Sequence, residues 1–125
     1  MDITPLIPSD RKVIKSYGDG KFTLTNGDSY GHSIIITPEG VEEWDIESFA
    51  DITEAHFESL LARVNELDVV IIGTGKEFKT LLPKLQQSLR AKGLRTETMD
   101  TGAACRTYNV LLAEERRVAA ALIAI

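Results

Sequence analysis

The stretch from Asp68 to Met99 constrains the fold of this chain more than any other. It opens with the unbroken apolar run Val69-Val70-Ile71-Ile72, which is typical of a strand buried on both faces. Apolar residues then recur at helical spacing, at Phe78, Leu81, Leu82, Leu85 and Leu89. From Leu94 to Met99 the pattern alternates, as it does in a strand. A strand–helix–strand crossover of this length joins parallel, neighbouring strands, so the sequence predicts an α/β fold.

Local signals bound the helix of this crossover. With Thr80 as N-cap, Pro83 falls in the first turn, where its missing N–H has no helical partner in any case. Gly93 suits the position just beyond the helix end, where a left-handed conformation is common. The sequence therefore predicts a helix between Thr80 and Gly93.

The first third of the chain has the character of a β-meander. Gly-containing turns at 18–20, 26–28 and 38–40 separate β-branched segments. The predicted strands are Val13–Tyr17, Lys21–Thr25, Tyr30–Thr37 and Val41–Asp45. Residues 1–10 carry two prolines without a clear period, which indicates an irregular arm.

Two further helices are predicted. One follows the apolar spacing from Ile52 to Val64, with Asp51 or Thr53 as N-cap. The other is capped by Thr101 and runs to about Glu114. The segment after it, Arg116–Ile125, fits two structures, because alanine favours a helix whereas an apolar run of this length suits a central strand.

Composition narrows the class of protein. A length of 125 residues fits one domain, 1–125, and the formal net charge of −5 disfavours nucleic acid as the main partner. The one cysteine allows no intrachain disulfide, as expected in a reducing compartment. No secretory signal is visible, and no apolar run approaches the length of a membrane span. We therefore expect a cytoplasmic protein that forms no membrane span, and pairing into a homodimer stays open.

No catalytic set stands out in the sequence. His32, His56 and Cys105 lie far apart along the chain, and no group of residues has the spacing of a metal site. Cysteine is among the residues most often buried, so we interpret Cys105 as an inert core thiol. We expect neither catalytic residues, nor a metal, nor a cofactor.

One candidate ligand site remains, at the end of the apolar strand. In α/β sheets, ligands favour the carboxyl ends of strands, where glycine lets the backbone approach them and helix N-termini attract anions. We expect the turn Gly73-Thr74-Gly75 and the helix start at Thr101 to face each other across a cleft for a small anion. Helical spacing puts residues 102, 106, 109 and 113 on a side away from the core and Tyr108 inside it. The predicted lining is Gly73, Thr74, Gly75, Thr101, Ala104 and Cys105, with Arg106 near the rim; the competing interpretation is a scaffold turn without a ligand.

Several pieces of the sequence together resemble a known family. These are Val70-Ile71-Ile72-Gly73-Thr74-Gly75, the segment 89–93 and the segment Met99–Leu111 with its Ala-Ala-Cys-Arg-Thr-Tyr-Asn stretch, followed by the Ala-rich ending. In order and spacing they are similar to a small family of unknown biochemical function that includes mitochondrial complex I assembly factor 3, in its bacterial branch. Relatives often have glycine where this chain has Glu115.

The resemblance implies a three-layer fold with a central mixed sheet, whose last strand, Val118–Ile123, runs antiparallel to its neighbours. It also implies a non-enzymatic binding protein that has a protein partner and helps to assemble membrane respiratory complexes from the soluble side. The alternative is a small-anion-binding protein, or an enzyme of unknown reaction, that uses the Gly73-Thr74-Gly75 edge.

Overall fold

Two β-sheets form the framework of the chain in the computed structural model, which describes residues 11–125. The larger sheet has the strand order β5-β4-β8-β6-β7, and the smaller one the order β1-β2-β3. The strands of the larger sheet are β4 (Ile34–Thr37), β5 (Gly40–Glu43), β6 (Val69–Gly73), β7 (Thr96–Met99) and β8 (Val118–Leu122). Those of the smaller sheet are β1 (Ile14–Gly18), β2 (Lys21–Leu24) and β3 (Ser29–Tyr30). The arm predicted for residues 1–10 lies outside the described residues.

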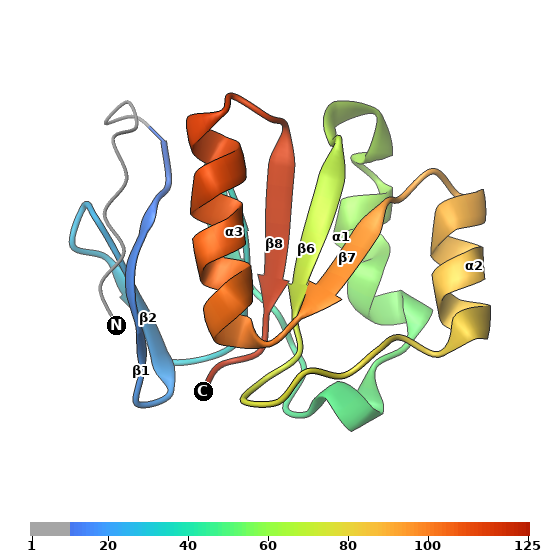
Figure 1. Ribbon diagram of the computed structural model, residues 1–125, viewed down its shortest axis with the longest axis horizontal. Helices are drawn as coiled ribbons and strands as arrows, with labels where there is room; N and C mark the ends of the chain where they lie inside the picture. The colour runs from blue at the N-terminus through green and yellow to red at the C-terminus, as the bar shows by residue number, and fades with distance from the viewer. Residues whose placement is uncertain (1–10) are drawn as a thin grey trace.

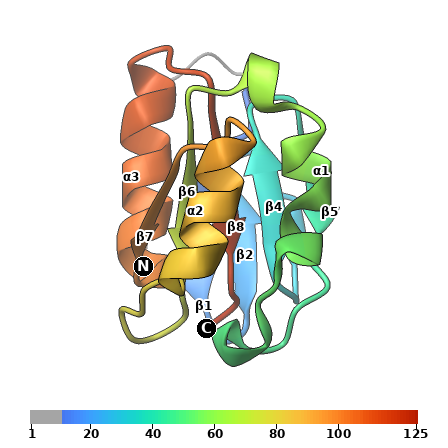
Figure 2. The same ribbon diagram turned by 90° about the vertical axis from the view of Figure 1, so that its right-hand side faces the viewer.

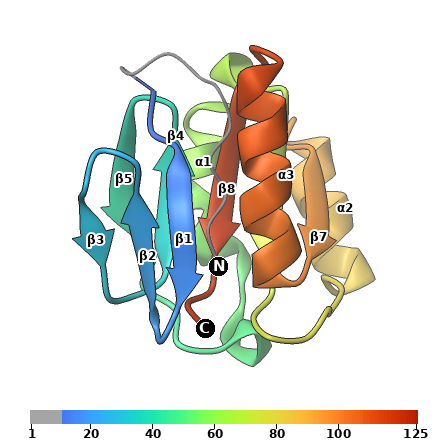
Figure 3. The same ribbon diagram turned by 60° about the vertical axis from the view of Figure 1, so that its left-hand side comes forward.

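The helices divide between the two faces of the larger sheet. They are α1 (Glu58–Leu61), α2 (Pro83–Ala91) and α3 (Thr101–Ala113). Figure 2 shows α1 and α2 over one face, and Figure 3 shows α3 beside the β1-β2-β3 sheet on the other. A separate cluster of buried apolar side chains fills each interface, one around Tyr108 and one around Trp44 and Phe57. The predicted three-layer α/β fold with a mixed central sheet is therefore confirmed.

The crossover from Asp68 to Met99 folds as predicted, because β6 and β7 pair in parallel. The ambiguous ending forms β8, which occupies the middle of the larger sheet (Figure 1). Its alanines leave room for layers on both faces, since Ala120 contacts the α3 side and Ala119 and Ala121 the other. The expectation of an antiparallel last strand is right for β4 and wrong for β6, with which β8 is parallel.

Two predicted elements are broken in the structure. The segment Tyr30–Thr37 divides at Gly31, because glycine weakens a strand interior and the chain there crosses from one sheet to the other. The helix predicted from Ile52 to Val64 is a series of short turns, η1 (Phe49–Asp51), η2 (Glu54–Phe57), α1 and η3 (Val64–Glu66). The indole of Trp44 donates to the carbonyl of His56 over 2.8 Å and so occupies an acceptor that a continuous helix would use.

Both long helices begin one or more residues away from the predicted caps. Leu82 has ψ 139°, because proline disfavours the helical region for the residue before it, so α2 begins at Pro83 and not just after Thr80. The N-cap of α3 is Asp100, whose carboxylate accepts from the N–H of Ala103, and Thr101 is the first helical residue. The predicted end of α2 is confirmed, since Gly93 has φ 93°.

Candidate functional site

The end of β6 is packed directly against the start of α3. A Cβ added to Gly73 would lie 2.9 Å from Oγ1 and 3.0 Å from Cα of Thr101, and 3.0 Å from a methyl group of Leu122. Such distances are too short for any side chain. Glycine at position 73 is therefore required by close packing between a strand and a helix.

Thr101 connects three segments at this point. Its N–H donates to the carbonyl of Gly75 (2.9 Å), and its hydroxyl accepts from the N–H of Gly75 (3.0 Å). The same hydroxyl donates to the carbonyl of Ile123 just after β8 (2.8 Å). The side chain of Thr101 is fully buried. The two predicted segments do face each other, but the N–H groups of Gly75 and Thr101 bond across the contact and not to a ligand between them.

Thr74 organises the loop that leads to α2. Its hydroxyl donates to the carbonyl of Glu77 (2.6 Å) and accepts from the N–H of Lys79 (3.1 Å). The backbone N–H of Thr74 donates to the carbonyl of Met99, so Thr74 is bonded both to the end of β7 and to its own loop. Thr74 and Gly75 line a surface pocket of about 330 Å³ together with Lys76 and Lys79. This pocket is the surface hollow beside the predicted turn, and Glu47 and Glu77 also line it.

Ala104 and Cys105 lie away from that pocket, in the core between α3 and the larger sheet. Both are fully buried. Burial raises the pKa of the Cys105 thiol to about 12, because a thiolate would have to leave water. At neutral pH the sulfur is therefore a protonated thiol with no nucleophilic character.

The flank of α3 that we expected to face away from the core is covered in part by β1. Asn109 is buried, and its amide accepts from the N–H of Ile14 (3.2 Å) and donates to its carbonyl (2.8 Å). Arg106 on the same flank is exposed and donates to the hydroxyl of Tyr17 on β1 (2.9 Å). Tyr108 is buried as predicted. The structure thus places Arg106 toward the β1-β2-β3 sheet, among residues that do not line the Thr74 pocket.

Acid–base groups are dispersed over residues 11–125. No three His, Cys, Asp or Glu side chains within that range gather as metal ligands would. The His56 ring accepts from the N–H of Thr53 (2.9 Å) at the start of η2, and His32 contacts the carbonyl of Ser33 (2.8 Å). Each histidine therefore has a local structural contact.

The most conspicuous exposed apolar side chains lie on the loop from Lys76 to Leu82. Phe78 is 60% exposed and Leu82 is 72% exposed. Leu81 between them is buried in the apolar cluster around Trp44 and Phe57, so the loop is anchored and still presents two large apolar groups to solvent. Both residues follow the helical spacing of the sequence, and Leu82 falls inside the predicted helix, but in the structure both lie before α2.

A family model covers most of the chain. Residues 14–123 match the family described as "Protein of unknown function (DUF498/DUF598)". The chain belongs to this family. The matched range includes both sheets and all three helices, so the DUF498/DUF598 domain is the whole described fold apart from a few terminal residues.

Relatives in the DUF498/DUF598 family carry different names. The mouse "NADH dehydrogenase [ubiquinone] 1 alpha subcomplex assembly factor 3" is 34% identical over 110 residues, which is 88% of this chain and 59% of the mouse protein. This chain therefore spans less than two thirds of that relative. The "13 kDa major membrane protein" of Francisella tularensis is 34% identical over 87% of this chain and 88% of its own length. The resemblance seen in the sequence is confirmed.

A solved structure has the same fold. The crystal structure named as an outer membrane protein from Bartonella henselae has a TM-score of 0.83 and 39% identity, and the match covers 91% of this chain and 95% of that one. Within residues 11–125 of the present chain, no helix combines the length and the apolar character that a membrane crossing requires.

Proposed function

We propose that this chain is a non-enzymatic binding protein that helps to assemble a membrane respiratory complex of the NADH dehydrogenase type. The observation that carries the proposal is the 34% identity, over 110 residues, with a protein named as an assembly factor for that complex. An assembly factor acts by binding a protein partner, and we propose that this one binds its partner from the cytoplasmic side.

The loop from Lys76 to Leu82 is the proposed contact surface. Aromatic side chains, phenylalanine among them, are enriched at protein interfaces, where they become buried on binding. Phe78 and Leu82 are the largest exposed apolar side chains of the loop and, with Val110, of the described chain. The anchoring bonds of Thr74 hold the start of this loop in the unbound protein, so little order is lost on binding.

Site-specific photo-crosslinking tests the proposal. A photoreactive phenylalanine analogue at Phe78, expressed in the organism that encodes the chain, should crosslink to a subunit of the NADH dehydrogenase complex or of its assembly intermediates. The matched control is the same analogue at exposed Thr25, in the turn between β2 and β3. Adducts that are absent at Phe78, or identical at both positions, would count against the proposal.

The alternative function is binding of a small anion at the Gly73-Thr74-Gly75 edge. Lys76 and Lys79 favour it, because both cations line the pocket that Thr74 and Gly75 also line, whereas Glu47 and Glu77 in the same lining oppose it. Of the other predicted residues, Gly73 and Thr101 support this edge from beneath, through the packing described above. Ala104, Cys105 and Arg106 are not part of the pocket lining.

A further inference from the structure

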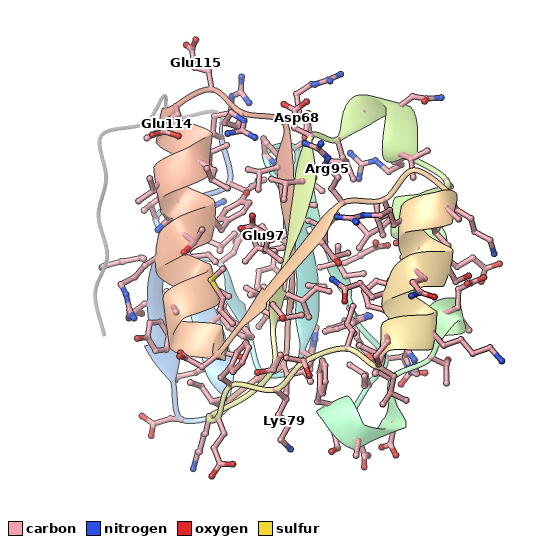
Figure 4. The ribbon with its side chains drawn as sticks, turned by 45° about the vertical axis from the view of Figure 1, so that its right-hand side comes forward. Asp68, Lys79, Arg95, Glu97, Glu114 and Glu115 are labelled. Atoms are coloured by element: carbon pink, nitrogen blue, oxygen red, sulfur yellow. The ribbon has the colours of Figure 1, made fainter. Side chains whose placement is uncertain are left out.

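The outer edge of β7 is open to a further strand. In a parallel ladder, alternate residues bond to the same neighbour, and the carbonyls of Arg95 and Met99 accept from the N–H groups of Val70 and Thr74 over 2.8 and 2.9 Å. The N–H and C=O groups of Thr96 and Thr98 consequently point away from the sheet. Figure 4 shows β7 uncovered between α3 and α2. A groove of about 360 Å³ that Thr96 and Thr98 line together with residues of α2 and the preceding loop adjoins this edge.

The side chains along this edge carry opposite charges. Arg95 and Glu97 are exposed and project into the same open space between the helices (Figure 4). They share one side of the strand, because side chains alternate along it and both positions are odd-numbered. Within residues 11–125 neither side chain has a hydrogen-bond or ion-pair partner. Arg95 and Glu97 are two residues apart on an open edge. In a second copy that runs in the opposite direction, the same two charges come in reverse order, so each side chain can lie opposite one of opposite charge.

We infer that two copies of this chain pair through their β7 edges, as antiparallel strands related by a two-fold axis at Thr96. In this register the outward groups of Thr96 bond to those of Thr96 in the second copy, and Arg95 of each copy lies opposite Glu97 of the other. Residues opposite each other at a non-hydrogen-bonded position have Cα atoms about 4.5 Å apart, within easy reach of an Arg–Glu ion pair. The larger sheet then continues through both copies.

The backbone permits few other symmetric registers. If the register shifts by one residue, the outward N–H and C=O groups of one strand face residues of the other strand whose own N–H and C=O groups point inward to β6. No hydrogen-bonded ladder can then form. Centring the pair on Glu97 satisfies the backbone but brings two carboxylates face to face, which is destabilising. Charge therefore favours the Thr96 register over the one centred on Glu97.

The opposite edge of the sheet does not offer the same match. β5 presents Glu42 and Glu43, both exposed, next to Glu39 in the preceding turn. Pairing two copies there would gather carboxylates from both, and charged edges of this kind discourage strand pairing. The β7 edge is thus the self-complementary one.

Charge reversal tests the inference. Sedimentation velocity from micromolar to millimolar protein should show a concentration-dependent dimer. Arg95→Glu and Glu97→Arg should each raise its dissociation constant by about tenfold or more, because two attractive pairs become repulsive. The double variant restores both pairs in reverse order and should recover dimerisation. Both positions are exposed, so circular dichroism of each variant should match the parent fold.

Disulfide crosslinking tests which register the two strands adopt. Cα atoms of a hydrogen-bonded antiparallel pair lie about 5.5 Å apart, a distance that suits a disulfide. Thr96→Cys should form a disulfide-linked dimer under mild oxidation, whereas Thr98→Cys should not, because residue 98 faces residue 94 of the second copy. Cys105 does not interfere, since it is fully buried. A monomer at all concentrations, a dimer insensitive to the charge reversals, or faster crosslinking at 98 than at 96 would each overturn the inference; a monomer would leave this edge to a strand of another protein.

Discussion

Replacing Thr101 with valine tests the hydrogen bonds that connect the start of α3 to the ends of β6 and β8. Valine keeps the shape of the side chain and removes the hydroxyl. The N–H of Gly75 then loses its acceptor and the carbonyl of Ile123 loses a donor, both at a position where Thr101 is fully buried. An unsatisfied buried polar group costs about 1–3 kcal/mol, and the added methyl group recovers about 1 kcal/mol. For the two groups together, we expect the free energy of unfolding to fall by about 1–5 kcal/mol, a large part of the roughly 5–15 kcal/mol available to a domain.

Urea unfolding followed by circular dichroism measures this change. The control is Thr107→Val, which makes the same chemical change on the same helix at a half-buried position. The control should shift the free energy of unfolding by no more than about 0.5 kcal/mol. Equal effects of the two substitutions would refute the reasoning, because the hydrogen bonds of Thr101 would then contribute nothing specific.

Four further predictions concern three single residues and the pocket beside Thr74. Glu115 has a left-handed backbone conformation with φ 60°, which glycine adopts at lower cost than other residues. Glu115→Gly should therefore stabilise the chain by about 0.5–1 kcal/mol in the same urea assay, while Glu115→Ala should not, and a loss of stability with glycine would contradict this. The hydrogen bonds from Arg117 hold the pKa of Asp68 below its ordinary value of 3.8, so this carboxylate stabilises the fold above pH 3.8, and the contribution is lost as pH falls through the lowered pKa. The difference in stability between the parent and Asp68→Asn should therefore shrink in acid, and a constant difference would be inconsistent with the bond. The Cys105 thiol should react with Ellman's reagent only in denaturant, and rapid reaction of the folded chain would show that the thiol is accessible. If the pocket beside Thr74 binds an anion, phosphate, sulfate or an organic acid at 100 times its dissociation constant should add about 2.7 kcal/mol of stability in a thermal-shift series, and a flat response to the whole series would exclude that function.

The central crossover was predictable because its signals are local. The apolar run of β6, the helical spacing of α2 and the alternation of β7 each follow from a few neighbouring residues. Gly73 and Thr101 were also predicted to meet, since parallel strands bring the loops after them to one edge. The strand β8 could not be separated from a helix by its alanines alone, and only the family resemblance favoured the strand.

Other features depend on contacts between distant segments. Asn109 follows the spacing of an exposed flank, and only the position of β1 shows that its amide binds the backbone of Ile14. The direct contact between the turn and the helix start has a similar origin, because the bonds of Thr101 run to Gly75 and Ile123, just beyond the ends of β6 and β8. A glycine at position 73 could be interpreted equally well as room for a ligand or as room for a helix, and the structure shows the helix there.

The amount of assembled NADH dehydrogenase in cells that lack this chain tests the proposed function most directly. Native gels of membranes from a deletion strain should show less of the complete complex and more of its partial assemblies. The parent chain should restore the complex, whereas a variant with both Phe78→Ser and Leu82→Ser, expressed at the same level and equally folded, should not. Normal amounts of the complete complex in the deletion strain would contradict the proposal.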